Sequence, residues 1–124
     1  MKNVLEHSRK ADIAFSRNGR IDIGARIARL LRLRKGDVVA LATDGEEIYL
    51  YVRYRQPAIG RYEGTVYPSN RRGFHFRTSS KAVCEAVMER CGAGFKARLF
   101  TGEPVSDPAC GTMLPIITRT LLQS

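Results

Sequence analysis

Arginine is the residue type in this sequence that offers the clearest chemistry. Three arginines recur at every third position, at Arg26, Arg29 and Arg32, and two more flank an Asn-Gly pair, at Arg17 and Arg20. The planar guanidinium matches phosphates and guanine edges through paired hydrogen bonds, so such a cluster is suited to contact a nucleic acid. A merely solvated helix face is the alternative, because arginine is also a good helix former.

The overall charge points in the same direction. The chain has 21 Lys and Arg against 12 Asp and Glu, which gives a net charge of +9 and a pI near 10.0. This excess favours a polyanionic partner, although a generally basic surface is the alternative. A second basic turn adds two more arginines. The candidate DNA-binding residues are therefore Arg17, Arg20, Arg26, Arg29, Arg32, Arg71 and Arg72.

Residues that commonly perform catalysis or hold metals form no recognisable motif. His7 and His75 have no partner at a catalytic spacing, and the sequence contains no Walker loop, no GxSxG and no HExxH. Cys84, Cys91 and Cys110 form no CxxC pair. Buried thiols explain Cys84 and Cys91 best, and a metal site with His75 is the alternative. We expect a non-enzymatic protein with no cofactor and no metal.

The first half of the chain is expected to position the arginines on a β-β-α-β-β unit. The Asn-Gly pair is a strong hairpin signal, and Ile27, Leu30 and Leu31 gather on one side of a predicted helix. Ile48, Leu50 and Val52 alternate with polar and aromatic residues in the last strand. The pattern predicts strands at 12–16 and 20–23, a helix at 25–33, and strands at 38–43 and 46–53.

The second half repeats this order of elements. The pattern predicts strands at 63–68 and 74–77, a helix at 81–91 capped by Ser79 or Ser80, and strands at 95–100 and 112–118. Phe74 and Phe76 are expected to point inward, and Pro115 predicts an edge strand or a bulge. We interpret 63–118 as a diverged copy of 12–53, with a chance match of pattern as the alternative.

The domain organisation follows from this duplication. Residues 1–11 are expected to be a flexible basic arm, 54–62 a linker and 119–124 a tail. Half-units of this kind cannot cover their own apolar faces, so both would share one small barrel-like core. The predicted fold class is α+β, mainly β.

A Gly-Arg pair, alternating apolar residues, a basic helix and a Gly-Asp turn follow one another before the predicted hairpin. The matching residues are Gly19, Arg20, Ile21, Ile23, Leu31, Leu33, Gly36 and Asp37. In this order, residues 12–53 resemble the AbrB-like (SpoVT/AbrB) swapped-hairpin DNA-binding domain of bacterial transition-state regulators and MazE-like antitoxins. Gly24 stands where the family usually has Pro, and Arg32 where it usually has Gly.

The resemblance implies both a fold and a function. Family members build their DNA-binding unit from two chains that exchange hairpins, so this chain would be a pseudo-dimer within one polypeptide. Arg20 and Arg29 match basic positions that the family uses on DNA, whereas Ile13 stands at another such position. The implied function is a non-enzymatic, bacterial-type DNA-binding protein that regulates transcription.

Other partners remain open at this point. A protein-interaction or assembly module that keeps the fold without specific DNA binding is the main alternative, and a homo-oligomer is compatible with either function. RNA is a third alternative, suggested by Tyr49, Tyr51, Phe74 and His75 among basic residues. No apolar run approaches the roughly 18 residues of a membrane span, and the N-terminus lacks a signal-like apolar region. We therefore expect a cytoplasmic protein without a membrane partner.

Overall fold

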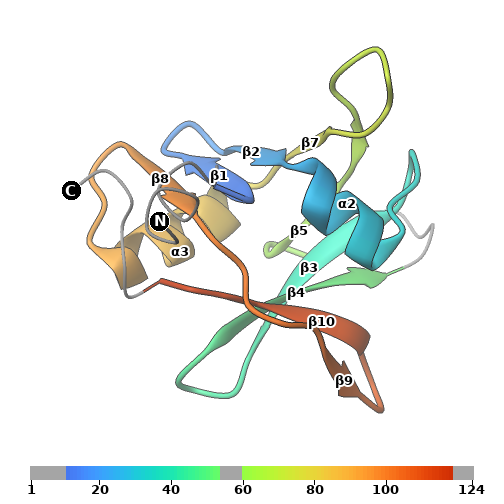
Figure 1. Cartoon of the computed structure of the whole chain (residues 1–124). Helices are drawn as coiled ribbons and strands as arrows, with labels where there is room; N and C mark the ends of the chain where they lie inside the picture. The colour runs from blue at the N-terminus through green and yellow to red at the C-terminus, as the bar shows by residue number, and fades with distance from the viewer. Residues whose placement is uncertain (1–10, 54–59, 119–124) are drawn as a thin grey trace, which may run out of the picture.

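The computed structural model describes residues 11–53 and 60–118, and within them the chain forms two five-stranded antiparallel sheets and two helices (Figure 1). The elements in chain order are β1 (Ile13–Ser16), β2 (Arg20–Ile23), α2 (Ala25–Leu31), β3 (Val38–Thr43), β4 (Ile48–Arg53), β5 (Glu63–Thr65), β6 (Tyr67–Pro68), β7 (Phe76–Ser79), α3 (Lys81–Cys91), β8 (Lys96–Leu99), β9 (Val105–Asp107) and β10 (Gly111–Ile116). The predicted α+β class with a majority of strand is confirmed. The predicted arm up to residue 10, linker residues 54–59 and the tail lie outside the described residues.

The two halves of the chain are joined strand to strand in both sheets. Sheet A has the order β6-β7-β2-β1-β8, and sheet B has the order β5-β3-β4-β10-β9. In sheet A, β2 pairs with β7, and in sheet B, β4 pairs with β10, with Leu50 opposite Leu114. The first strand of each half also pairs with the strand that follows the other half's helix, β1 with β8 and β5 with β3. Neither half therefore completes a sheet by itself.

One hydrophobic cluster fills the space enclosed by the sheets and helices. The predicted alternation in β4 is confirmed, because Ile48, Leu50 and Val52 are buried while Tyr49 and Tyr51 are half-buried. Each fully buried aliphatic or phenyl side chain contributes roughly 1.5–3 kcal/mol to folding. Helix α3 covers the inner face of sheet A (Figure 1). Its buried residues are Val83, Cys84, Val87 and Met88.

Helix α2 ends two residues earlier than the sequence predicts. Arg32 adopts a left-handed conformation, with φ at 53°, and its N–H donates to the Arg29 carbonyl at 3.2 Å. The N–H of Leu33 donates to the Ala28 carbonyl at 2.9 Å, which closes the helix end. Leu33 is buried just beyond this turn, whereas Leu30, expected on the buried side, is 37% exposed.

Helix α3 spans the predicted residues. The hydroxyl of Ser80 accepts a hydrogen bond from the N–H of Val83 at 3.2 Å, so Ser80 is the N-cap. Gly92 ends the helix with φ at 69°.

The strand predicted at 74–77 lies instead at Phe76–Ser79. Phe76 is buried, but Phe74 is 57% exposed, so the prediction that Phe74 points inward is wrong. The physical reason is a closed turn before β7, in which the N–H of Ser69 donates to the His75 carbonyl at 2.9 Å. This turn keeps Phe74 outside the strand.

Three further segments of the second half differ from the prediction. The strand predicted at 63–68 divides into β5 and β6, which belong to different sheets, because the N–H of Val66 donates to the Asp37 carbonyl at 2.8 Å. Strand β9 lies between the predicted strands at 95–100 and 112–118, where the sequence predicts no strand. Strand β10 lies between β4 and β9 over Gly111–Met113, so the strand as a whole is not an edge strand, which is one of the two interpretations of Pro115. Pro115 is tolerated because β9 pairs only as far as Met113.

The close approach of β5 to β7 predicts a stability effect at Gly64. A Cβ at this buried glycine would lie 2.9 Å from the Ser79 carbonyl oxygen and even closer to the Thr78 hydroxyl. Gly64→Ala should therefore lower the free energy of unfolding by about 1–3 kcal/mol in urea titrations. Gly94→Ala, which has open space around its Cβ, is the matched control and should change it by less than about 0.5 kcal/mol. Equal losses in both variants would contradict the crossing of these strands.

Candidate nucleic-acid interface

The face of sheet A that points away from the core carries most of the candidate site, and we call it the outer face. Antiparallel register aligns its side chains in rows, while the alternate residues Ile13, Phe15, Ile21 and Ile23 are buried. One row across the sheet is Tyr67, Arg77, Asp22, Ala14 and Arg98. The row beside it is Ser79, Arg20, Ser16 and Lys96. Lys and Arg therefore outnumber carboxylates on this face.

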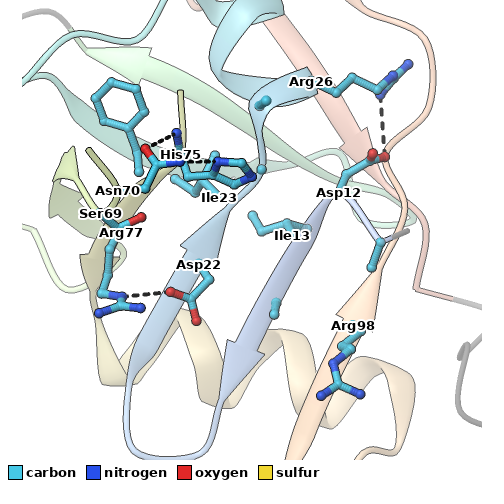
Figure 2. Close-up of a pocket in the computed structure, with 15 residues that line it drawn as sticks. Asp12, Ile13, Asp22, Ile23, Arg26, Ser69, Asn70, His75, Arg77 and Arg98 are labelled. Atoms are coloured by element: carbon cyan, nitrogen blue, oxygen red, sulfur yellow. Dashed lines mark hydrogen bonds and ion pairs between the residues drawn. The ribbon is translucent and has the colours of Figure 1, made fainter. Parts of the chain in front are cut away.

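Asp22 is shared between two arginines on neighbouring strands. Its carboxylate accepts a hydrogen bond from Arg77 Nε at 2.7 Å (Figure 2). It also pairs with Arg20 Nε at 3.2 Å. The hydrogen bond to Asp22 raises the pKa of Arg77 above its usual value. One negative charge thus orients two positive ones and leaves this part of the face positive. Within the described chain, Arg98 has no carboxylate partner.

An open hollow of about 890 Å³ lies at the end of the outer face where α2 begins. It is bordered by the strands, the start of α2 and the turn from Ser69 to His75 (Figure 2). The side chains of Asn70 and His75 are hydrogen bonded at 2.9 Å, which stabilises this turn. Arg71 and Arg72 belong to this turn, and both are exposed.

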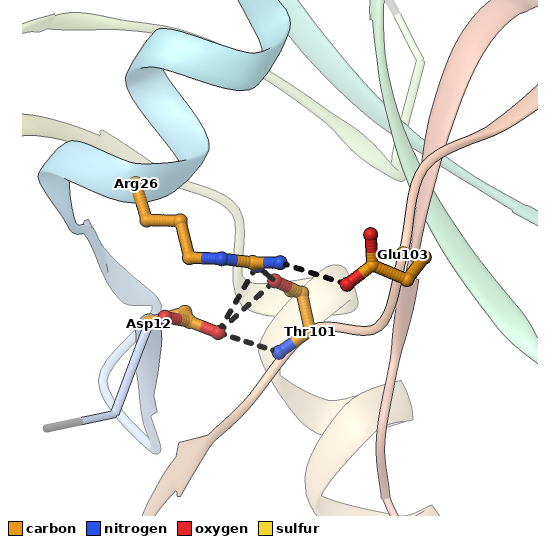
Figure 3. Close-up of polar contacts among 4 residues, drawn as sticks. All are labelled: Asp12, Arg26, Thr101 and Glu103. Carbon is orange, nitrogen blue, oxygen red and sulfur yellow. Dashed lines mark hydrogen bonds and ion pairs between the residues drawn. The ribbon is translucent and has the colours of Figure 1, made fainter. Parts of the chain in front are cut away.

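Arg26 does not belong to an exposed arginine stripe, which corrects the sequence prediction. Arg26 Nη1 donates to the Thr101 hydroxyl at 2.7 Å and to the Asp12 carboxylate at 3.5 Å (Figure 3). The Asp12 carboxylate also accepts from the Thr101 N–H at 2.8 Å, and its side chain is only 5% exposed. Glu103 lies 3.8 Å from Arg26 Nη2. Arg26 therefore joins α2 to the segment after β8.

The other predicted arginines fall into separate groups. Arg17 and Arg20 lie at the β1–β2 turn, where Arg17 Nε donates to the Gly94 carbonyl. Arg29 and Arg32 are exposed on α2, at the opposite end of β2. The structure therefore does not bring Arg17 and Arg20 next to the α2 arginines. The Arg71-Arg72 turn borders the same hollow as the start of α2.

Sequence reasoning missed three cations of the outer face, namely Arg77, Lys96 and Arg98. Lys96 and Arg98 alternate with the buried Ala97 and Leu99, and this alternation could have indicated that they share a face. The pairing of β8 with β1 could not be found in the same way, because the two strands are about eighty residues apart in the chain.

Arg90, in the last turn of helix α3, contacts the backbone of the first half of the chain. Arg90 donates to the carbonyls of Glu46 and Gly45, and its Nη2 lies 3.3 Å from the Gly45 oxygen. This contact attaches the end of α3 to the β3–β4 turn. Arg90 is therefore engaged in the fold rather than free on a solvated helix face.

Residues 11–53 and 60–118 contain neither a cluster of potential metal ligands nor a membrane-spanning helix. No group of three His, Cys, Asp or Glu side chains in these ranges is placed to hold a metal ion. Cys84 is buried, and desolvation raises the pKa of its thiol. Neither helix in the described ranges is long and apolar enough to cross a membrane.

Comparison with known proteins gives no assignment for this site. No family model, no curated protein and no solved structure matches the chain. The chemistry of the site therefore rests on its geometry. The outer face with its two flanking basic turns can bind a polyanion through guanidinium and ammonium groups.

The Asp12–Arg26–Thr101 contact predicts a loss of stability when the carboxylate is removed. Asp12→Asn should lower the free energy of unfolding by about 1–3 kcal/mol, because it removes the buried carboxylate that accepts from the part-buried Arg26 guanidinium and from Thr101. Chemical denaturation measures the change. Glu103→Gln is the control, since the Glu103 side chain is 93% exposed and should contribute less than about 0.5 kcal/mol. An Asp12→Asn variant whose free energy of unfolding equals that of the unmodified protein would contradict the structural role of Arg26.

Proposed function

We propose that this chain is a non-enzymatic DNA-binding protein, a transcriptional regulator of AbrB-like type, that contacts DNA through the outer face of sheet A. The observation that carries the proposal is the uncompensated positive charge on and beside this face. In the described chain, Lys96, Arg98, Arg71 and Arg72 have no carboxylate partner, and the carboxylate of Asp22 is shared. Duplex DNA presents one negative charge about every 1.7 Å of its axis, so such a face gains free energy by replacing condensed counterions.

The strand pairing supports the AbrB-like part of the proposal. In that family, two chains exchange hairpins, and here β1 with β8 and β5 with β3 would make an equivalent exchange between two halves of one chain. The left-handed conformation of Arg32 agrees with the resemblance, because the family usually has glycine at this position. The proposed architecture is a pseudo-dimer with a swapped-hairpin core.

The proposed contacts follow from the positions of the side chains. Arg17 and Arg20 would meet the phosphates at one end of the face, and Arg71 and Arg72 those at the other. Arg29 and Arg32 would extend the contact along α2, while Arg26 acts by holding α2 in place. A cytoplasmic location is part of the same proposal.

The salt dependence of binding tests this function. A labelled pool of genomic duplex fragments, titrated by anisotropy between low and moderate salt, should show affinity that falls steeply with ionic strength. The double variant Arg71→Ala/Arg72→Ala should reduce the slope of log K against log salt by about 1.8, or about 0.9 per lost phosphate contact. The matched control is Arg34→Ala/Lys35→Ala, an exposed basic pair in the α2–β3 turn, which should leave the slope unchanged.

Two outcomes would contradict the proposed function. Absence of binding at low ionic strength would remove nucleic acid as the partner and favour the protein-interaction module. Equal loss of slope in both double variants would show that affinity comes from total charge and not from the outer face.

A further inference from the structure

Three exposed aromatic residues lie in the segments that border the outer face of sheet A, and we call them the aromatic rim. Tyr67 is 46% exposed, Phe74 is 57% exposed and Phe95 is 80% exposed. Single exposed apolar residues are common on protein surfaces and need no explanation by themselves. The feature that requires an explanation here is that each of the three is next to a cation of this face or of its flanking turns, either in the strand register or within two residues along the chain.

Each member of the aromatic rim has a positively charged neighbour. Tyr67 lies directly opposite Arg77 in the register of β6 and β7. Phe74 shares its turn with Arg71 and Arg72. Phe95 precedes Lys96 in the chain, and its carbonyl accepts a hydrogen bond from the N–H of Arg17 at 3.0 Å.

The backbone holds both phenylalanines in place. The turn that contains Phe74 is closed by the hydrogen bond from Ser69 to His75 and by another from the N–H of Gly73 to the Asn70 carbonyl at 3.2 Å. Arg17 contacts the carbonyls of both Gly94 and Phe95 and so fixes the second site. Side chains presented on an ordered backbone lose less entropy when they bind.

The two phenylalanines lie at opposite ends of the outer face. Phe74 precedes the start of β7, which pairs with Ile23, and Phe95 precedes the start of β8, which pairs with Ser16 at the other end. Along the strands these ends are three residue steps apart, about 10 Å at about 3.3 Å per residue, and across the sheet β7 and β8 are three strand spacings apart, about 14 Å. Phe74 and Phe95 are therefore placed to contact different bases of one strand.

We propose that the aromatic rim stacks on unstacked nucleobases while the neighbouring cations hold the flanking phosphates. Every base presents a π-face, and aromatic side chains interleaved with basic ones bind single-stranded nucleic acid in this way. The inference rests on the proposed function and names the state of its ligand: nucleic acid with unpaired bases, supplied either by a single strand or by a locally opened duplex.

Affinity for matched probes tests the preference for unpaired bases. Three labelled DNA probes of equal length are titrated at one salt concentration: a single strand, a duplex with a central bubble, and the fully paired duplex. The single strand and the bubble should bind about tenfold more tightly than the paired duplex. Phe74→Leu and Phe95→Leu should each remove about tenfold of the single-strand affinity, because leucine keeps the apolar bulk without a π-face.

The chain contains no tryptophan, which permits a direct spectroscopic readout of stacking. Phe74→Trp and Phe95→Trp each introduce one indole, whose fluorescence should be quenched when the single strand binds and whose π-face should preserve affinity. Tyr62→Trp is the matched control, because Tyr62 is 45% exposed but lies beside sheet B, where its carbonyl accepts from the Leu41 N–H. Circular dichroism verifies that every variant is folded.

The outcomes separate this proposal from the function on which it rests. Equal affinity for paired and unpaired probes, with unaffected leucine variants, would overturn the stacking role and leave DNA binding intact. Absence of binding to all three probes at low salt would overturn both. Binding to phosphatidylserine vesicles in place of DNA would also overturn both, since a basic face with exposed phenylalanine would then serve a membrane surface.

Discussion

The antiparallel pairing of β2 with β7 is the contact on which the candidate site depends. It places Asp22 opposite Arg77, so that one carboxylate orients arginines from both halves of the chain. It also brings the turn from Ser69 to His75 beside the start of α2, where the hollow forms. Without this pairing, Arg77 and the turn from Ser69 to His75 would be separated from Asp22 and α2, and the continuous outer face would not exist.

The same constraint applies to stability. Because β4 pairs with β10 in sheet B and β2 with β7 in sheet A, each sheet contains strands of both halves, and the core closes only when both are present. The contact of Arg26 with Asp12 and Thr101 strengthens this arrangement, since it connects residues that are 14 and 75 positions apart. A charged group with this structural role is less available to a ligand than its place on a helix suggests.

Local patterns in the sequence predicted the elements well, because hairpin turns, helix caps and alternation depend on near neighbours. The hairpin at Asn18-Gly19, the Ser80 cap and the buried face of β4 are of this kind. Contacts between distant residues could not be read in this way. Arg26 is not exposed with the other helix arginines because it binds Asp12, a carboxylate outside its helix. Phe74 is exposed because a hydrogen bond between Ser69 and His75 closes the turn that contains it.

The site was predictable in chemistry but only partly in position. An excess of arginine indicated a polyanionic ligand, and four of the predicted residues, Arg17, Arg20, Arg71 and Arg72, lie on or beside the outer face. Arg77, Lys96 and Arg98 joined them only once the strand order was known. A face assembled from both halves is a property of the pairing, which no single segment encodes.

Amide chemical-shift mapping during titration with a DNA oligonucleotide tests the central claim most directly, because it reports the contacted surface residue by residue. We expect the largest shift changes on β1, β2, β7 and β8, on the β1–β2 turn and on the turn from Ser69 to His75. Changes concentrated on β3, β4 and β10, with sheet A unaffected, would contradict the central claim.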